Sequence, residues 1–430
     1  MVAKLVSTKA LLCALALATP ILFFKGTNEL FEFPKMIFVY ILGSTAFFVF
    51  IIERIKSNTL SFTFSKLDKY VLLFLGANVL STIFSINRYT STWGYYTRFN
   101  GGLVSVVIFT MIYFVFVHGT TKEEREKVLD FVLYATVPVC IYAIAQSFGF
   151  EKGYWEEDSS ARVFASLGQP NWLAAYLVLT IFPALSKMLA ASTAKLRGLF
   201  ATIVLLNYFA LWFTYSLSGL LGFVVALVVF LIFVEKNLLT QNKKALFGIF
   251  LICILVSVLK PGILGPKIRD SLRDAKIISQ NSLIAYAAEE QVVAERKFGD
   301  TTAIRLAVWQ GTLRSIVSSP KNVFVGTGPE TFPYAFPPFR PEELNQTSEW
   351  DFVFNKPHNY YLELLSNLGL LGLALYLVLI ITVLKSVRKP AALPLVCGIL
   401  GLAVSDFFGW HTVTSSLVLT LYIGLIGTYE

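Results

Sequence analysis

The strongest constraint on this chain is a series of apolar runs that recur along most of its length. The hydrocarbon core of a bilayer is ~30 Å thick and takes about 20 apolar residues per helix, or fewer when flanking side chains snorkel. The composition is 56% apolar and 15% charged, which excludes an ordinary soluble enzyme and a disordered chain. We therefore predict an all-α polytopic membrane protein. The candidate spans, about twelve, are residues 11–24, 36–52, 70–86, 101–118, 128–148, 171–190, 198–215, 217–234, 245–259, 368–384, 391–407 and 413–429.

Basic residues predict how these spans are oriented. Alternate connections hold eighteen Lys and Arg, whereas the short connections on the opposite side hold six. Because cytoplasmic loops carry the excess of basic residues, we expect a multi-pass protein of the cytoplasmic membrane with both termini in the cytoplasm. The same bias accounts for much of the net charge of +9, so the charge does not indicate nucleic acid. The first run lacks a small-residue cleavage site and is followed by further spans, which favours an anchor over a cleaved signal peptide.

One connection is far longer than the others. Residues 260–357 form a large loop on the external, or periplasmic, face, and they precede the tenth span. Apolar residues at helical spacing predict an interfacial helix over residues 267–297 and a second helix over residues 303–317. The sequence has no internal repeat and no low-complexity linker. We therefore predict one membrane domain, residues 1–430, with one large and partly helical external loop.

Arginines concentrate on the face predicted to be external. Guanidinium groups stay charged and fit phosphate oxygens in a bidentate fork, so several of them at a membrane surface suit a lipid-anchored diphosphate. Arginines at membrane interfaces also commonly pair with lipid phosphates, and composition alone favours that simpler role. The external arginines are Arg98, Arg162, Arg305, Arg314 and Arg340.

His358 lies where the long loop re-enters the membrane, directly after Lys356 and Pro357. A lone histidine is usually structural, but a neutral imidazole accepts a proton near neutral pH. Pro357 ends any preceding helix, so we expect His358 at or near a helix N-terminus. Such a position disfavours the imidazolium form and favours a nearby phosphate.

The sequence gives little support for metal chemistry, and no cofactor is predicted. No pair among the three histidines has the spacing of metal ligands, and the four cysteines lie inside apolar runs. The acidic run of residues 156–158 could hold a divalent cation, but a solvated loop is the simpler interpretation.

Several motifs in this order resemble the O-antigen ligase family, which includes O-antigen ligases, some polymerases of the same glycans and protein O-oligosaccharyltransferases. The predicted layout of twelve spans with a large loop before the tenth also resembles this family. The motifs that carry the resemblance are residues 162–174, 305–309, 326–332, 358–363 and 368–372, with RVFASLGQPNWLA, RLAVW, GTGPETF, HNYYLE and LGLLG.

This resemblance implies a metal-independent glycosyltransferase of the cell envelope, acting in O-antigen or lipopolysaccharide assembly. The donor would be a glycan on undecaprenyl diphosphate, and the acceptor a hydroxyl group on a lipid, a glycan or a protein. By similarity, Arg305 would hold the diphosphate leaving group and His358 would orient or deprotonate the acceptor. The expected substrate-binding residues are Arg162, Asn171, Arg98, Gly326, Gly328, Asn359, Tyr361 and Glu363.

Two positions depart from the family pattern. Leu217 stands where the family commonly has an arginine, so one diphosphate ligand is either absent or supplied by another residue such as Arg98. Asn367 stands where an acidic residue is frequent. Either departure is compatible with a divergent acceptor or with an inactive relative.

Other functions remain open on the sequence alone. A polymerase that adds repeat units would use the same donor site as a ligase. A lipid-glycan flippase or transporter is a less favoured alternative, because the spans hold few ionisable groups at bilayer depth. The tryptophans near the external boundary, Trp172 and Trp410 among them, are most simply interface anchors, although some could stack on sugars.

Overall fold

A computed structural model describes residues 7–58, 63–262 and 300–429, and within these ranges all regular elements are helices. The all-α prediction is therefore confirmed. The longer helices are α1 (Thr8–Ala18), α2 (Glu32–Lys56), α3 (Lys66–Ile83), α5 (Leu103–His118), α6 (Lys122–Ser147), α7 (Pro170–Ala190), α8 (Ala194–Phe213), α9 (Leu217–Phe233), α11 (Lys243–Leu259), α13 (Asp300–Val317), α16 (Tyr360–Leu384), α17 (Leu393–Ser405) and α18 (Val413–Gly427). The shorter ones are α4 (Arg88–Trp93), α10 (Lys236–Gln241), α14 (Pro320–Val325) and α15 (Phe332–Ala335).

Each predicted apolar run falls on one of the longer helices. Five helices, α2, α6, α7, α8 and α16, are long and apolar enough to cross a membrane. The helices α1, α5, α9, α17 and α18 are apolar but shorter. Integral membrane character is thus supported, while the count of about twelve spans and the orientation of the termini stay predictions.

Helix starts follow from the local sequence. Ser65 and Thr121 begin α3 and α6 with capping boxes, in which Asp68 and Glu124 return the hydrogen bond to the cap residue. At α7, the Gln169 side chain accepts from two backbone amides, and proline occupies the first helical position, where no amide is needed. These starts fix where each apolar run enters the bundle.

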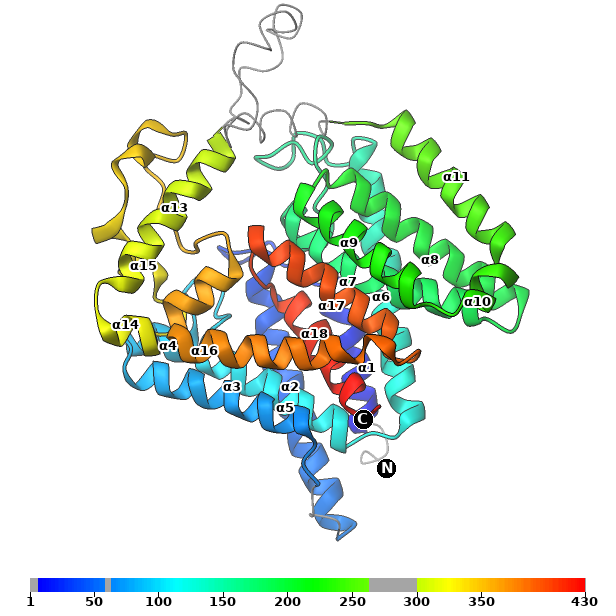
Figure 1. The fold of residues 1–430 in the computed structure, drawn as a ribbon, viewed down its shortest axis with the longest axis horizontal. Helices are drawn as coiled ribbons and strands as arrows, with labels where there is room; N and C mark the ends of the chain where they lie inside the picture. Colours follow the sequence, from blue (N-terminus) through cyan, green and yellow to red (C-terminus); the bar gives the residue numbers. More distant parts are fainter. Residues whose placement is uncertain (1–6, 59–62, 263–299, 430) are drawn as a thin grey trace, which may run out of the picture.

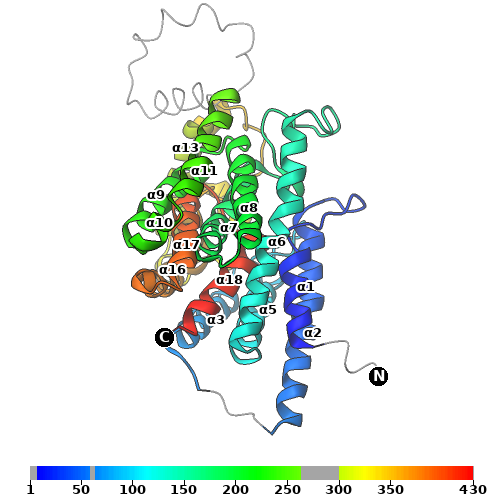
Figure 2. The same cartoon turned by 90° about the vertical axis from the view of Figure 1, so that its right-hand side faces the viewer.

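Burial separates the centre of the bundle from its periphery. Helix α7 is the central helix, and 78% of its most apolar 18-residue stretch is buried. It packs on α8, α9, α17 and α18. Helix α11 has no buried residue and packs on α8 at the edge of the molecule (Figure 1). Its large apolar side chains are exposed, and Val258 and Leu259 are each 69% exposed. Such an apolar surface fits contact with lipid chains and not with water. On another side, α1, α2 and α6 stand side by side (Figure 2).

The connections predicted to be external meet at one end of the bundle. Arg162 contacts the connection between α8 and α9 through the carbonyl of Thr214, and the indole of Trp212 donates to the carbonyl of Lys260. Towards the other end of the bundle, Lys187 on α7 pairs with Asp130 on α6 at 2.6 Å.

The described part of the large loop, residues 300–357, forms a small unit at one edge of the molecule (Figure 1). We call it the loop unit. The predicted second helix is confirmed as α13, whereas the predicted interfacial helix over residues 267–297 lies outside the described residues. The unit has its own apolar core, and α13 and α14 pack on α16. That core consists of Ile304, Val308, Phe332, Phe336, Leu344 and Phe354.

The loop unit and α16 cross at unusually close range, which explains the glycine-rich sequence there. Gly326 has φ +79°, and a Cβ atom on it would lie 2.2 Å from the carbonyl oxygen of Asn367. Gly369 kinks α16 with φ +66°, and its Cβ would lie 2.3 Å from the backbone of Phe324. Only glycine fits two backbones that approach this closely. The crossing holds the loop unit against α16.

Candidate active site

The connection between α6 and α7 carries Arg162 and is held in place by two buried polar side chains. The Gln146 side-chain oxygen accepts from the backbone amides of Phe164 and Ala165 at 3.2 and 2.8 Å. Lys35, fully buried on α2, donates to the carbonyl of Ser166 at 2.7 Å. These bonds give the connection a fixed path across the end of the bundle.

Arg162 is anchored by uncharged acceptors. Its Nε donates to the carbonyl of Thr214 at 3.0 Å, and its Nη2 donates to Oδ1 of Asn171 at 3.1 Å. The Ser216 hydroxyl donates to the same oxygen of Asn171 at 2.8 Å. Burial lowers the pKa of Arg162 to about 10, Glu157 partly offsets this, and Arg305 adds to it. Arg162 therefore stays cationic and lies near a second guanidinium.

His358 occupies a strained backbone position between the loop unit and α16. Its φ is +55°, and the next residue, Asn359, caps α16 by accepting from the amide of Leu362 at 3.1 Å. The Trp309 indole donates to the carbonyl of Pro357 at 3.0 Å. The expectation that His358 lies at a helix N-terminus is confirmed. Left-handed backbone at a non-glycine residue costs energy and persists where its surroundings hold it, often at functional sites.

The imidazole of His358 is electrostatically disfavoured as a cation. Burial lowers its pKa to about 4, with further contributions from the positive charges of Arg305 and Arg98. Burial also lowers the pKa of Arg305 on α13, and Glu349 opposes this. His358 is consequently neutral at pH 7, as the sequence predicted, and it lies within the field of two arginines.

Two tryptophans complete the site. The ring centroid of Trp410 lies 4.9 Å from that of His358 in an edge-on arrangement and 5.7 Å from that of Trp172. The Arg98 guanidinium lies 5.3 Å from the Trp172 ring and 5.8 Å from the Trp410 ring, within cation–π range. Its Nε is buried and has no hydrogen-bond partner among the described residues. We call Arg98, Arg162, Arg305, His358, Trp172 and Trp410 the arginine site.

Beside the arginine site lies a buried ion-pair network. The Lys356 ammonium bonds one carboxylate oxygen of Glu330 and one of Glu363, and all three side chains are buried. Burial alone lowers the pKa of Lys356, yet the two carboxylates outweigh it and hold the pKa above its usual value. We call these three residues the Lys356 cluster. Since Glu330 lies in the loop unit and Glu363 on α16, Lys356 joins both to the segment that carries His358.

The structure brings together Arg98, Arg162, Asn171, Arg305 and His358 from the residues predicted by sequence. The other predicted residues have different partners. Asn359 caps α16, the Tyr361 hydroxyl donates to the carbonyl of Ala403 at 2.6 Å, and Glu363 bonds Lys356.

The two predicted glycines pack inside the protein. Gly326 approaches α16, and a Cβ on Gly328 would lie 2.2 Å from the Ser85 hydroxyl. Both glycines are thus in close contact with other protein segments, and their substrate-binding role stays a prediction.

Sequence reasoning missed two parts of the site. Trp172 and Trp410 were assigned most simply to the membrane interface, and Lys356 was not singled out. A local signal existed for Lys356, which is a charged residue two positions from His358. The two carboxylates that pair with Lys356, those of Glu330 and Glu363, are not its neighbours in the sequence, so the local sequence does not indicate the pairing.

Comparison with known proteins bears on part of the chain. Residues 200–377 match the O-antigen ligase family, which supports an O-antigen ligase family assignment. The matched region runs from α8 into α16 and includes Arg305 and His358, whereas Arg98, Arg162 and Trp410 lie outside it. A search of curated proteins found no significant match.

Proposed function

Since its match over residues 200–377 supports an O-antigen ligase family assignment, and thus a membrane enzyme that transfers glycans, we propose that this chain moves a glycan from undecaprenyl diphosphate to an acceptor hydroxyl group. The observation that carries the proposal is the combination of three guanidinium groups with one neutral imidazole. We place the reaction at the external end of the bundle, which is the periplasmic face where a second membrane is present.

The arginines suit the diphosphate. Arg98, Arg162 and Arg305 come from three separate segments and converge without carboxylate partners at ion-pair distance among the residues that the structure describes. Such a group of like charges is unfavourable until an anion arrives, and guanidinium groups bind phosphate oxygens with paired hydrogen bonds. In this proposal, Arg98 supplies the guanidinium group that the family pattern places at Leu217.

In the proposed step, the acceptor oxygen attacks the anomeric carbon of the donor glycan. The new carbon–oxygen bond forms as the bond to the diphosphate breaks, and the bond electrons leave with undecaprenyl diphosphate. The acceptor proton passes to the unprotonated nitrogen of His358. The arginines stabilise the negative charge that develops on the leaving group, and the imidazole takes the proton.

Donor binding would also change His358. Its pKa is about 4 because of burial and two neighbouring cations. A bound diphosphate brings negative charge to the same place and so favours the imidazolium. The base would become stronger when the leaving group is in position, which ties proton transfer to an occupied donor site.

The remaining predicted residues would support the site by keeping the segments and side chains that form it in place. Asn359, Tyr361 and Glu363 fix the start of α16 and the segment that bears His358. Asn171 orients Arg162 through its side-chain oxygen. Trp172 and Trp410 present flat rings beside the arginines, where a donor sugar could stack.

The test is the glycan profile of a deletion strain complemented with wild type or with His358→Ala at matched membrane levels. We expect polyprenyl-linked long chains to accumulate in the deletion strain and with His358→Ala, because loss of a general base lowers rates by about 10²–10⁴-fold. Single unpolymerised repeats on the surface would instead identify a polymerase that uses the same donor. Unchanged glycans in both strains would overturn the proposal.

A further inference from the structure

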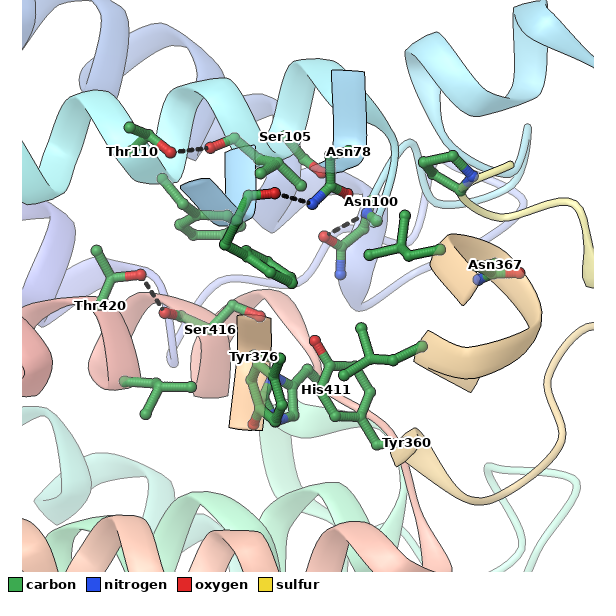
Figure 3. A pocket seen from close by; sticks show the side chains of 18 of the residues that line it. Asn78, Asn100, Ser105, Thr110, Tyr360, Asn367, Tyr376, His411, Ser416 and Thr420 are labelled. Atoms are coloured by element: carbon green, nitrogen blue, oxygen red, sulfur yellow. Dashed lines mark hydrogen bonds between the residues drawn. The ribbon is translucent and has the colours of Figure 1, made fainter. Parts of the chain in front are cut away.

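A cavity of about 180 Å³ lies between α3, α5, α16 and α18 (Figure 3). One end of its lining is polar and includes Glu330, Lys356 and His411. Further along the helices the lining is mostly apolar, with Phe109 and Ile423 among its residues, and the hydroxyl groups of Thr110 and Thr420 there donate to carbonyls of their own helices. The cavity is therefore amphipathic along its length.

The cavity and the arginine site share a wall. Tyr360 lines the cavity two residues after His358, and His411 lines it directly after Trp410. The rings of Tyr360 and His411 stack with centroids 3.9 Å apart, while His358 and Trp410 meet at 4.9 Å in the arginine site. The two short segments 358–360 and 410–411 thus separate the cavity from the arginine site.

The charges on the two sides of this wall are opposite. In the Lys356 cluster, one ammonium serves two carboxylates, so the polar end of the cavity has excess negative charge. Three guanidinium groups give the arginine site excess positive charge. An anionic head group would be repelled from the cavity and drawn to the arginines. An uncharged head group has no such preference for the arginine site.

Two buried oxygens in the cavity wall lack hydrogen-bond donors. Glu363 and Asn367, one turn apart on α16, are only 5% and 6% exposed. Oε2 of Glu363 and Oδ1 of Asn367 have no partner in the described part of the chain, and both residues line the cavity. Buried acceptors are costly when unpaired, so they indicate a missing donor. Hydroxyl groups are uncharged donors of the required kind.

We propose that this cavity binds an uncharged lipid with a hydroxylated head group, of the glycolipid class. The hydroxyl groups donate to Glu363 and Asn367, and the hydrocarbon chain lies along Phe109 and Ile423. The volume exceeds that of the engineered cavity of about 150 Å³ that binds benzene, so a stretch of chain fits. The site goes beyond the proposed glycan transfer and does not depend on it.

The test measures binding alone, so its failure is distinct from failure of the proposed transfer. The full chain in phosphatidylcholine nanodiscs is labelled with an alkyl glucoside whose chain carries a diazirine, and the labelled residues are mapped by mass spectrometry. We expect label on residues of α5, α16 or α18 that line the cavity. Glucosyl diacylglycerol should compete for this label at least tenfold better than phosphatidic acid of the same acyl chains.

Three variants sharpen the result. Ser416→Phe fills the cavity and should reduce the label at least tenfold. Asn367→Leu removes one acceptor but keeps the backbone contacts of residue 367. It should reduce the label about two- to tenfold, which is the change in binding expected from the loss of one hydrogen bond. Ser366→Ala is the matched control, because the Ser366 hydroxyl is also buried and unpaired among the described residues but does not line the cavity.

Gel filtration checks that each variant folds. If Ser416→Phe does not fold, the comparison of wild type with Asn367→Leu is sufficient to test the proposal. Equal labelling of wild type and Asn367→Leu would overturn the proposal. Equal competition by phosphatidic acid, or label spread over the lipid-facing surfaces, would overturn it as well.

Discussion

The arginine site and the Lys356 cluster include residues only two positions apart in the sequence, His358 and Lys356. They differ in how their cationic side chains are paired. Lys356 meets two carboxylates inside the protein, so its charge is compensated before any ligand arrives. Arg162 is held by a carbonyl and an amide oxygen, and Arg98 lies against aromatic rings. These two arginines are fixed in place without being neutralised by those contacts.

This difference separates a structural role from a binding role. A buried ion-pair network costs desolvation energy that is recovered only within the network, so removing one member leaves uncompensated charge. A cluster of like charges recovers its cost only from a ligand of opposite charge. Substitutions in the Lys356 cluster should therefore act on stability, and substitutions in the arginine site should act on turnover.

The largest effect is expected from Lys356→Met. The substitution leaves Glu330 and Glu363 buried without their cation, and breaking such a network costs about 3–5 kcal/mol. Thermal unfolding of the purified protein, followed by tryptophan fluorescence, should show a strongly lowered midpoint. The triple variant Lys356→Met, Glu330→Gln, Glu363→Gln should regain most of the loss. A Lys356→Met protein that unfolds like wild type would remove the structural role of this cluster.

Arg305→Gln should lower glycan transfer about 10²–10³-fold, the usual loss when one donor to a developing anion is removed. Its thermal midpoint should not fall, since the substitution removes repulsion with Arg162. Transfer is measured with purified lipid-linked donor. Arg314→Gln on the same helix α13 is the control, because Arg314 is exposed and should leave transfer unchanged. Equal losses in both variants would indicate a nonspecific effect of charge.

The same comparison shows what could be predicted from the sequence. Apolar runs located most of the longer helices of the bundle because the signal is local and 14 to 21 residues long in each case. The motifs also identified Arg162, Arg305 and His358, which the structure brings into one site. His358 was expected at a helix N-terminus because Pro357 precedes it, and that expectation depended only on neighbouring residues.

Relations between distant segments could not be predicted in this way. Lys356 pairs with Glu330, a partner from the loop unit, and hydropathy contains no information on such pairing. Gly326 is predicted to bind substrate, whereas in the structure it packs against the backbone around Asn367, a contact that the neighbouring sequence does not indicate. Trp410 could not be distinguished from an interface anchor, because its contact with His358 depends on how α16 and α18 are placed.

A smaller effect is expected from Trp410→Leu in the arginine site. The substitution removes the ring that contacts His358 and one of the two rings near Arg98. Cation–π contacts contribute about 0.5–2 kcal/mol, so transfer should fall about 2- to 30-fold. Trp410→Phe keeps an aromatic face and should retain most activity. Trp350→Leu, at an exposed position, is the control for loss of a tryptophan. If Trp410→Phe loses as much as Trp410→Leu, the flat ring is not the feature that matters.

The smallest effect concerns the pH dependence of transfer. Neutral His358 is the active form, and its pKa in the free protein is about 4 because of burial, Arg305 and Arg98. As pH falls, kcat/KM should therefore decline only near pH 4, whereas kcat should decline at a higher pH because bound diphosphate favours the imidazolium. Arg98→Gln removes one neighbouring cation, so the pKa of His358 should rise and the kcat/KM decline should move to higher pH.

The position of this decline is independent of the size of the activity, so Arg98→Gln is informative even if its transfer is slow. Arg314→Gln should leave the decline where wild type has it. An unmoved decline in Arg98→Gln would show that Arg98 does not act on the imidazole, and the arginine site would then reduce to Arg162 and Arg305. A shift would show that the charges that bind the leaving group also set the pKa of the base.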